Sequence, residues 1–68
     1  MERSLELLAK VRAGTLSGRM LGATERQSLV ALLAADGLSG PEIAQILQVS
    51  DRTVERDRRD IRDRYALP

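Results

Sequence analysis

The chain has 68 residues and a formal net charge of +1. A chain of this length forms one domain at most, because it buries only about 60% of the surface that its unfolded form exposes. It contains no cysteine and no histidine, which argues against disulfides, zinc sites and the usual nucleophile and base pairs of enzymes. We therefore expect no enzymatic activity, cofactor, metal or small-molecule ligand.

Tyr65 is the only aromatic residue, so the core must consist of aliphatic side chains, a composition that suits packed helices. Binding of single-stranded nucleic acid usually needs several aromatic platforms, and this chain lacks them. The longest apolar run, residues 29–35, is far shorter than the roughly 20 residues that span a bilayer. We expect a cytoplasmic protein without a membrane partner.

Residues 2–13 predict a first helix, because Leu5, Leu8 and Val11, with Ala9, fall on one stripe at helical spacing. The stripe is interpreted as a layer of the core, and a dimerisation helix is the alternative. Residues 14–22 hold three glycines and predict a connector with at most one helical turn. Arg19 beside a glycine leaves open an alternative in which this connector wraps a phosphate.

A second helix is expected to start at Thr24, which forms a capping box with Gln27, and Glu25 adds favourable charge there. Gly37 supplies the left-handed residue that ends many helices, so this helix should end at Asp36 and Gly37. Its predicted apolar face consists of Leu29, Leu32 and Leu33.

A third, short helix is predicted from a second capping box, Ser39 with Glu42, and from Pro41 in the first turn, where a missing N–H costs nothing. It should end near Gln48. Its predicted buried side consists of Ile43, Ala44, Ile46 and Leu47.

The last helix is expected to open at Ser50 as N-cap, after a very short turn at 49–50. Val54, Ile61 and Tyr65 form its narrow apolar stripe. A short helix, a tight turn and a longer helix are typical of the helix-turn-helix, and Ala44 is small where its two helices cross.

These elements predict an all-α bundle of four helices, or five if the connector holds one. The single domain 1–68 would comprise an N-terminal helix with its connector, 1–22, and a three-helix core, 24–65, with the motif at 39–65.

Residues 37–61 read GLSGPEIAQILQVSDRTVERDRRDI, which resembles the LuxR-type and sigma-region-4-like helix-turn-helix, and VSDRTVERD at 49–57 is similar to DeoR-type motifs. Compact N-terminal modules of phage small terminases are also similar. The resemblance implies double-stranded DNA as the partner, with the second helix of the motif in the major groove. The chain departs from these patterns at Gln48, where many members have glycine, and at Asp57 and Arg58, where an apolar residue is usual.

The DNA interpretation assigns phosphate contacts to Ser39, Ser50 and Thr53, since hydroxyls at helix starts supply many such contacts. It assigns base or phosphate contacts to Arg52, Arg56 and Arg59, which share the face opposite Val54 and Ile61.

Two alternatives apply to these residues. Opposite charges at four-residue spacing along residues 55–64 are also typical of a solvated, ion-paired helix. Thr53 also fits as a capping partner of Ser50. Asp57 and Arg58 are expected to tie the last helix to its neighbours.

Transcription regulation by a bacterial or phage protein is the predicted function. Viral DNA recognition for genome packaging is the first alternative. A protein-protein interaction module that docks through the Leu5, Leu8 and Val11 stripe is the second. Because one small module binds weakly, a homo-oligomer is expected in the native context.

Overall fold

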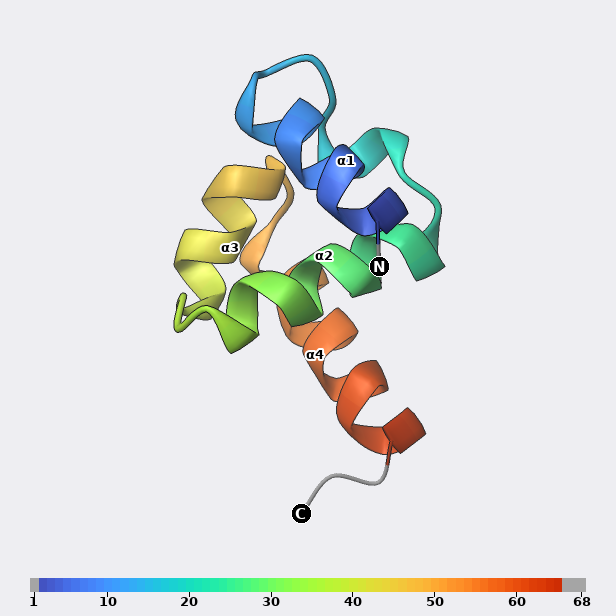
Figure 1. The fold of residues 1–68 in the computed structure, drawn as a ribbon. Coiled ribbons are helices and arrows are strands. Elements are labelled where there is room, and N and C mark those ends of the chain that lie inside the picture. The colour runs from blue at the N-terminus through green and yellow to red at the C-terminus, as the bar shows by residue number, and fades with distance from the viewer. Residues whose placement is uncertain (1, 66–68) are drawn as a thin grey trace.

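The computed structural model describes residues 2–65 and the side-chain environments of residues 3–64. Residues 2–65 form four α-helices and one short 3-10 helix, with no strand (Figure 1). Their bounds are α1 Glu2–Arg12, η1 Gly18–Met20, α2 Ala23–Ala35, α3 Gly40–Leu47 and α4 Asp51–Tyr65. The all-α prediction is therefore confirmed, and η1 is the single turn expected in the connector. No helix in the described part of the chain is long and apolar enough to span a bilayer.

The start of α2 differs from the sequence prediction. The N-cap is Gly22, and the carboxylate of Glu25 accepts the Gly22 backbone N–H over 3.4 Å. Gly22 has no side chain, so only the glutamate half of a capping box forms. The predicted capping box of Thr24 and Gln27 is wrong. Gln27 is only 8% exposed, and its side chain instead forms a hydrogen bond with Asp60 of α4.

The link between α2 and α3 follows local rules. Gly37 adopts φ +92° after α2, as its glycine predicts. The Ser39 N–H donates to Glu42 Oε1 over 2.8 Å, and the Glu42 N–H donates to Ser39 Oγ over 3.3 Å, which confirms the capping box. The Ser39 backbone N–H, helped by its hydroxyl, lowers the pKa of Glu42.

The turn between α3 and α4 is short and contains one residue with a left-handed backbone conformation. Gln48 ends α3 at φ 57° and ψ 44°, in the conformation that glycine adopts most easily. Two residues later, Ser50 Oγ accepts the Thr53 backbone N–H over 3.2 Å, which confirms Ser50 as the cap of α4. The helix-turn-helix geometry therefore forms although Gln48 replaces glycine.

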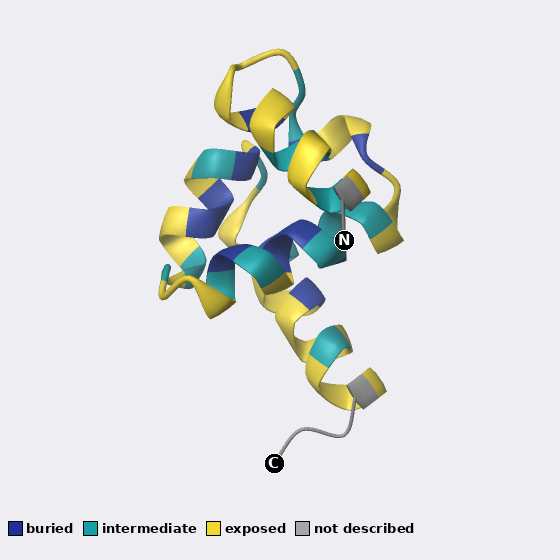
Figure 2. Ribbon diagram, viewed as in Figure 1, coloured by how far each residue is buried: buried dark blue, intermediate teal, exposed yellow. Residues whose placement is uncertain are grey.

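The core lies where α2, α3 and α4 meet, and each of these helices has buried segments there (Figure 2). The side chains that they give to the core are aliphatic. Ala44 is 3% exposed, as expected for a small residue in the middle of this packing. The most deeply buried aliphatic residues are Leu29, Val30, Leu33, Ile43, Leu47 and Val54.

Helix α1 covers one side of this core, which confirms it as a core layer, and two residues of the predicted stripe, Leu8 and Val11, pack there. Val11 is buried and Leu8 is half-buried, whereas Leu5 is 54% exposed and Leu7 packs against the core in its place. The prediction for Leu5 was wrong because spacings of three and four residues both place side chains on one face of a helix. Leu7 and Val11 therefore fit a helical stripe as well as Leu5 and Leu8 do. The side chain of Tyr65, predicted to extend the α4 stripe, lies outside the described residues.

Candidate nucleic-acid interface

Helix α4 has a buried side and a basic side. Val54 and Asp57 are buried where α4 packs against α2 and α3, and Ile61 is half-buried further along. Arg52, Arg56 and Arg59 are exposed. With about 3.6 residues per turn, these arginines fall within a narrow arc on the side opposite Val54 and Ile61. The three predicted arginines therefore share one solvent-facing surface within the first nine of the 15 residues of α4, which we call the arginine face.

A buried ion pair fixes α4 against α2. Arg26 donates from Nε to Asp57 Oδ2 over 2.6 Å and from Nη2 to Oδ1 over 3.0 Å. The side chains are 15% and 1% exposed. The hydrogen bonds to the Asp57 carboxylate raise the pKa of Arg26. Such a two-pronged bond sets both distance and orientation, so the arginine face keeps a defined direction relative to the rest of the domain.

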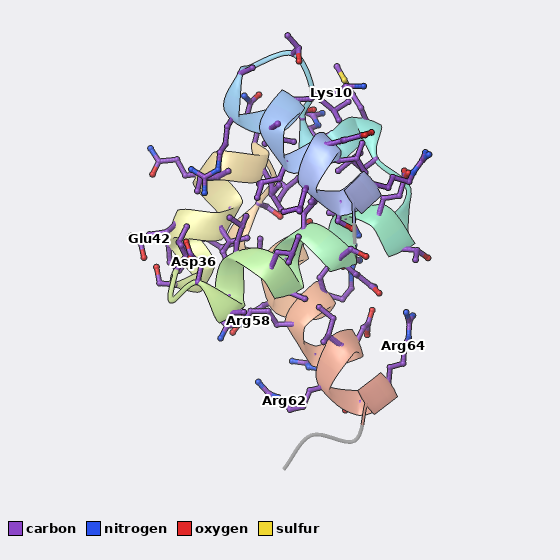
Figure 3. All side chains as sticks on the ribbon, viewed as in Figure 1. Lys10, Asp36, Glu42, Arg58, Arg62 and Arg64 are labelled. Carbon is purple, nitrogen blue, oxygen red and sulfur yellow. The ribbon has the colours of Figure 1, made fainter. Side chains whose placement is uncertain are left out.

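The expectation that Asp57 and Arg58 tie α4 to its neighbours is confirmed for Asp57. A Cβ placed on Gly40 would lie 3.4 Å from the Arg58 guanidinium, so Arg58 lies against the first turn of α3 (Figure 3). The partner of Asp57, Arg26, was not predicted. The sequence did indicate that Asp57 would need a partner, because its carboxylate stands at a position where an apolar residue is usual.

Gln27 and Asp60 add a second polar contact between α2 and α4. Gln27 Nε2 donates to Asp60 Oδ2 over 3.4 Å, a long hydrogen bond. The buried Oε1 of Gln27 has no protein donor among the described residues. An unpaired buried amide oxygen costs free energy, so this contact holds α4 less firmly than the ion pair beside it.

Within α4, no ion pair forms among the described side chains. Both ion pairs of residues 3–64 join different helices: Arg3 with Glu25, and Arg26 with Asp57. The four-residue pairs predicted by the alternative of an ion-paired helix, such as Glu55 with Arg59, are not closed. The guanidinium groups of the arginine face are therefore not occupied by carboxylates of the same helix.

The structure brings Ser50, Thr53 and Arg56 to one concavity of about 440 Å³. The Ser50 and Thr53 hydroxyls are 3.0 Å apart, as the capping interpretation of Thr53 requires. The remaining lining residues are Arg19, Arg26, Gln48 and Val49. Ser39 does not line this concavity, since it caps the opposite end of α3.

The described residues hold no group of three acidic, histidine or cysteine side chains that is placed to bind a metal ion. What they do form is a compact three-helix core, a left-handed turn and an outward arginine face on the last helix. This combination defines a helix-turn-helix DNA-binding domain.

The family comparison agrees with this geometry. Residues 20–66 match the family model of the homeodomain-like domain, so the chain belongs to the homeodomain-like helix-turn-helix family. No curated protein and no solved structure matches the chain. The match includes α2, α3 and α4 and leaves α1 outside.

Proposed function

We propose that the protein binds double-stranded DNA with α4 in the major groove and regulates transcription. The arginine face carries this proposal. Arg52, Arg56 and Arg59 are exposed within the first nine of the 15 residues of α4, and the N-terminal residues of a recognition helix are those that meet base edges. Arginine pairs with guanine O6 and N7 through two hydrogen bonds, which makes it the commonest base-reading side chain.

The ion pair between Arg26 and Asp57 supports the same function. A helix that reads base edges must hold its side chains within a fraction of an ångström, and rigid support favours that. Asp57 anchors α4 between Val54 and Ile61, while the neighbouring Arg56 faces outward. We propose that Ser39, Ser50 and Thr53 contact phosphates on either side of the groove, where hydroxyls at helix starts commonly do so.

A salt titration tests DNA binding. The 68-residue chain is titrated with a fluorescent random duplex at several salt concentrations. Each neutralised phosphate should contribute about −0.9 to the slope of log affinity against log salt concentration, so several contacts give a steep loss. Absence of binding at low salt would overturn the proposal and favour a protein-protein interaction module.

Selection from a duplex library distinguishes regulation from packaging. A transcription regulator should recover one sequence that binds ~10³-fold or more tightly than random duplex. Placed beside a promoter, that sequence should make transcription in vitro depend on the protein. If the selected duplexes share no preferred sequence and binding instead increases with duplex length, the result would contradict regulation and favour genome packaging.

We also propose that the protein acts as a homo-oligomer. A single module of this size covers only about 600–1,000 Å² of protein surface on DNA, and two linked modules gain avidity. A two-fold dimer should prefer half-sites ~34–36 Å apart. Sedimentation of the chain with and without a two-site duplex measures this, and a monomer that binds one site with nanomolar affinity at physiological salt would contradict it.

A further inference from the structure

Three arginines from three different elements line the concavity beside the start of α4. Arg19 comes from η1, Arg26 from α2 and Arg56 from α4. The other lining residues are uncharged, and none is acidic: Gln48, Val49, Ser50 and Thr53. The concavity therefore has a positive lining and carries hydroxyl groups, although the whole chain has a formal net charge of only +1.

Arg19 is held beside this concavity by its neighbour. Gly18 is buried, and a Cβ added to it would lie 2.9 Å from the Leu47 carbonyl oxygen and 3.1 Å from Val49 Cγ1. The backbone of η1 therefore packs directly on the end of α3 and on the turn that follows. Because only glycine allows this approach, the contact fixes the connector next to the helix-turn-helix.

The charges available to a ligand come from two of the three arginines. Asp57 neutralises the charge of Arg26 through the two-pronged ion pair. Arg19 and Arg56 are exposed, and neither forms an ion pair with a described side chain. Two exposed guanidinium groups beside a capped helix start supply the positive charge and the N–H donors that the oxygens of a phosphate diester accept.

We propose that this concavity binds one backbone phosphate of duplex DNA and that Arg19 is a ligand of that phosphate. The inference rests on the proposed function, because it places the phosphate next to the base pairs beneath α4. It adds a contact from outside the homeodomain-like match, which begins at residue 20. The connector thus belongs to the DNA interface rather than serving only to join α1 to the core.

The experiment compares Arg19→Ala with Arg62→Ala, which removes the same charge. Arg62 lies near the far end of α4 (Figure 3), eleven residues or roughly 16 Å along the axis from Asp51. With a random duplex, Arg19→Ala should flatten the slope of log affinity against log salt by about 0.9 and weaken binding about tenfold at low salt. Arg62→Ala should keep the parent slope, and Arg19→Lys should restore it.

Thermal unfolding provides the control for folding. Arg19 is exposed, so Arg19→Ala should unfold at the parent temperature. A drop in unfolding temperature that accounts for the lost binding would assign Arg19 a structural role and overturn the proposal.

Failure of this inference is distinguishable from failure of the proposed function. If the parent chain itself shows no salt-dependent duplex binding, the proposed function fails. If the parent binds steeply and Arg19→Ala keeps both slope and affinity, only the phosphate site is overturned. If inorganic phosphate raises the unfolding temperature through Arg19 while the duplex slope is unchanged, the site takes free phosphate and the DNA assignment is wrong.

Discussion

Helix α2 is joined to its neighbours by two ion pairs that differ in almost every physical respect. The pair with α4, Arg26 and Asp57, is two-pronged, with side chains 15% and 1% exposed. The pair with α1, Arg3 and Glu25, joins side chains that are 79% and 34% exposed. Water and salt screen the second pair but scarcely reach the first. The helix that carries the arginine face is therefore fixed in the domain, whereas the polar contact of α1 is a surface contact.

The largest expected effect comes from breaking the buried pair. Asp57→Ala leaves the Arg26 charge without a partner and should lower the free energy of unfolding by ~3–5 kcal/mol, measured by urea denaturation. Arg3→Ala is the matched control and should cost only ~0–1 kcal/mol. If the two variants lose similar unfolding free energy, the contact of α2 with α4 is no firmer than its contact with α1, which contradicts this account.

A double variant sharpens this test. Replacing both partners, Arg26→Met with Asp57→Leu, removes the buried charge together with its counterion and should restore most of the stability. A double variant as unstable as Asp57→Ala would mean that the loss arises from packing rather than from an uncompensated charge.

The second effect concerns the crossing of α3 and α4. Ala44 is 3% exposed, so Ala44→Leu has no space for its side chain and should cost ~1–3 kcal/mol of unfolding free energy. Ala35→Leu, at an exposed position of α2, is the size-matched control and should leave the thermal unfolding temperature nearly unchanged. Unfolding of Ala44→Leu at the parent temperature would mean that this position is not a close contact.

A smaller effect is expected at the start of α3. Ser39→Ala removes the side-chain acceptor of the Glu42 N–H and should cost ~1 kcal/mol in chemical denaturation. Thr15→Ala, whose hydroxyl donates to the Lys10 carbonyl after the end of α1, should cost less. A larger loss at Thr15 would contradict the view that α2, α3 and α4 carry the stability of the domain.

The smallest effect depends on pH. The folded domain lowers the pKa of Glu42 below its ordinary value of 4.5, so its charged form stabilises the fold above pH 4.5. This stabilisation is lost as the pH falls through the lowered pKa. The parent should therefore be more stable than Glu42→Gln at neutral pH, with a difference that shrinks in acid. A difference that is constant across this range would rule out the charged interaction.

The elements that form by local rules were predictable from the sequence. Ser39 and Glu42 are three residues apart in the chain, and Gly37 needs only its own backbone freedom, so both helix ends follow from short stretches of sequence. The choice between Leu5 and Leu7 on α1 was not predictable, because both lie on helical rows and only the position of α2 selects one.

The same limit applies to the interface. The arginine face of α4 follows from helical periodicity, since Arg52, Arg56 and Arg59 share one helix. The pairing of Arg26 with Asp57 joins residues that are 31 positions apart in sequence, and periodicity within one helix carries no information about it. Arg19 reaches the concavity only because Gly18 packs on the end of α3.

An alanine scan of five arginines of α4 tests the central claim most directly. Arg52→Ala, Arg56→Ala and Arg59→Ala should each weaken binding to a selected duplex, and a residue that reads guanine should lose ~1–3 kcal/mol together with sequence preference. Arg62→Ala and Arg64→Ala, at the far end of the helix, should lose clearly less (Figure 3). Equal losses at all five positions would contradict a recognition surface made by the arginine face and indicate a diffuse basic helix.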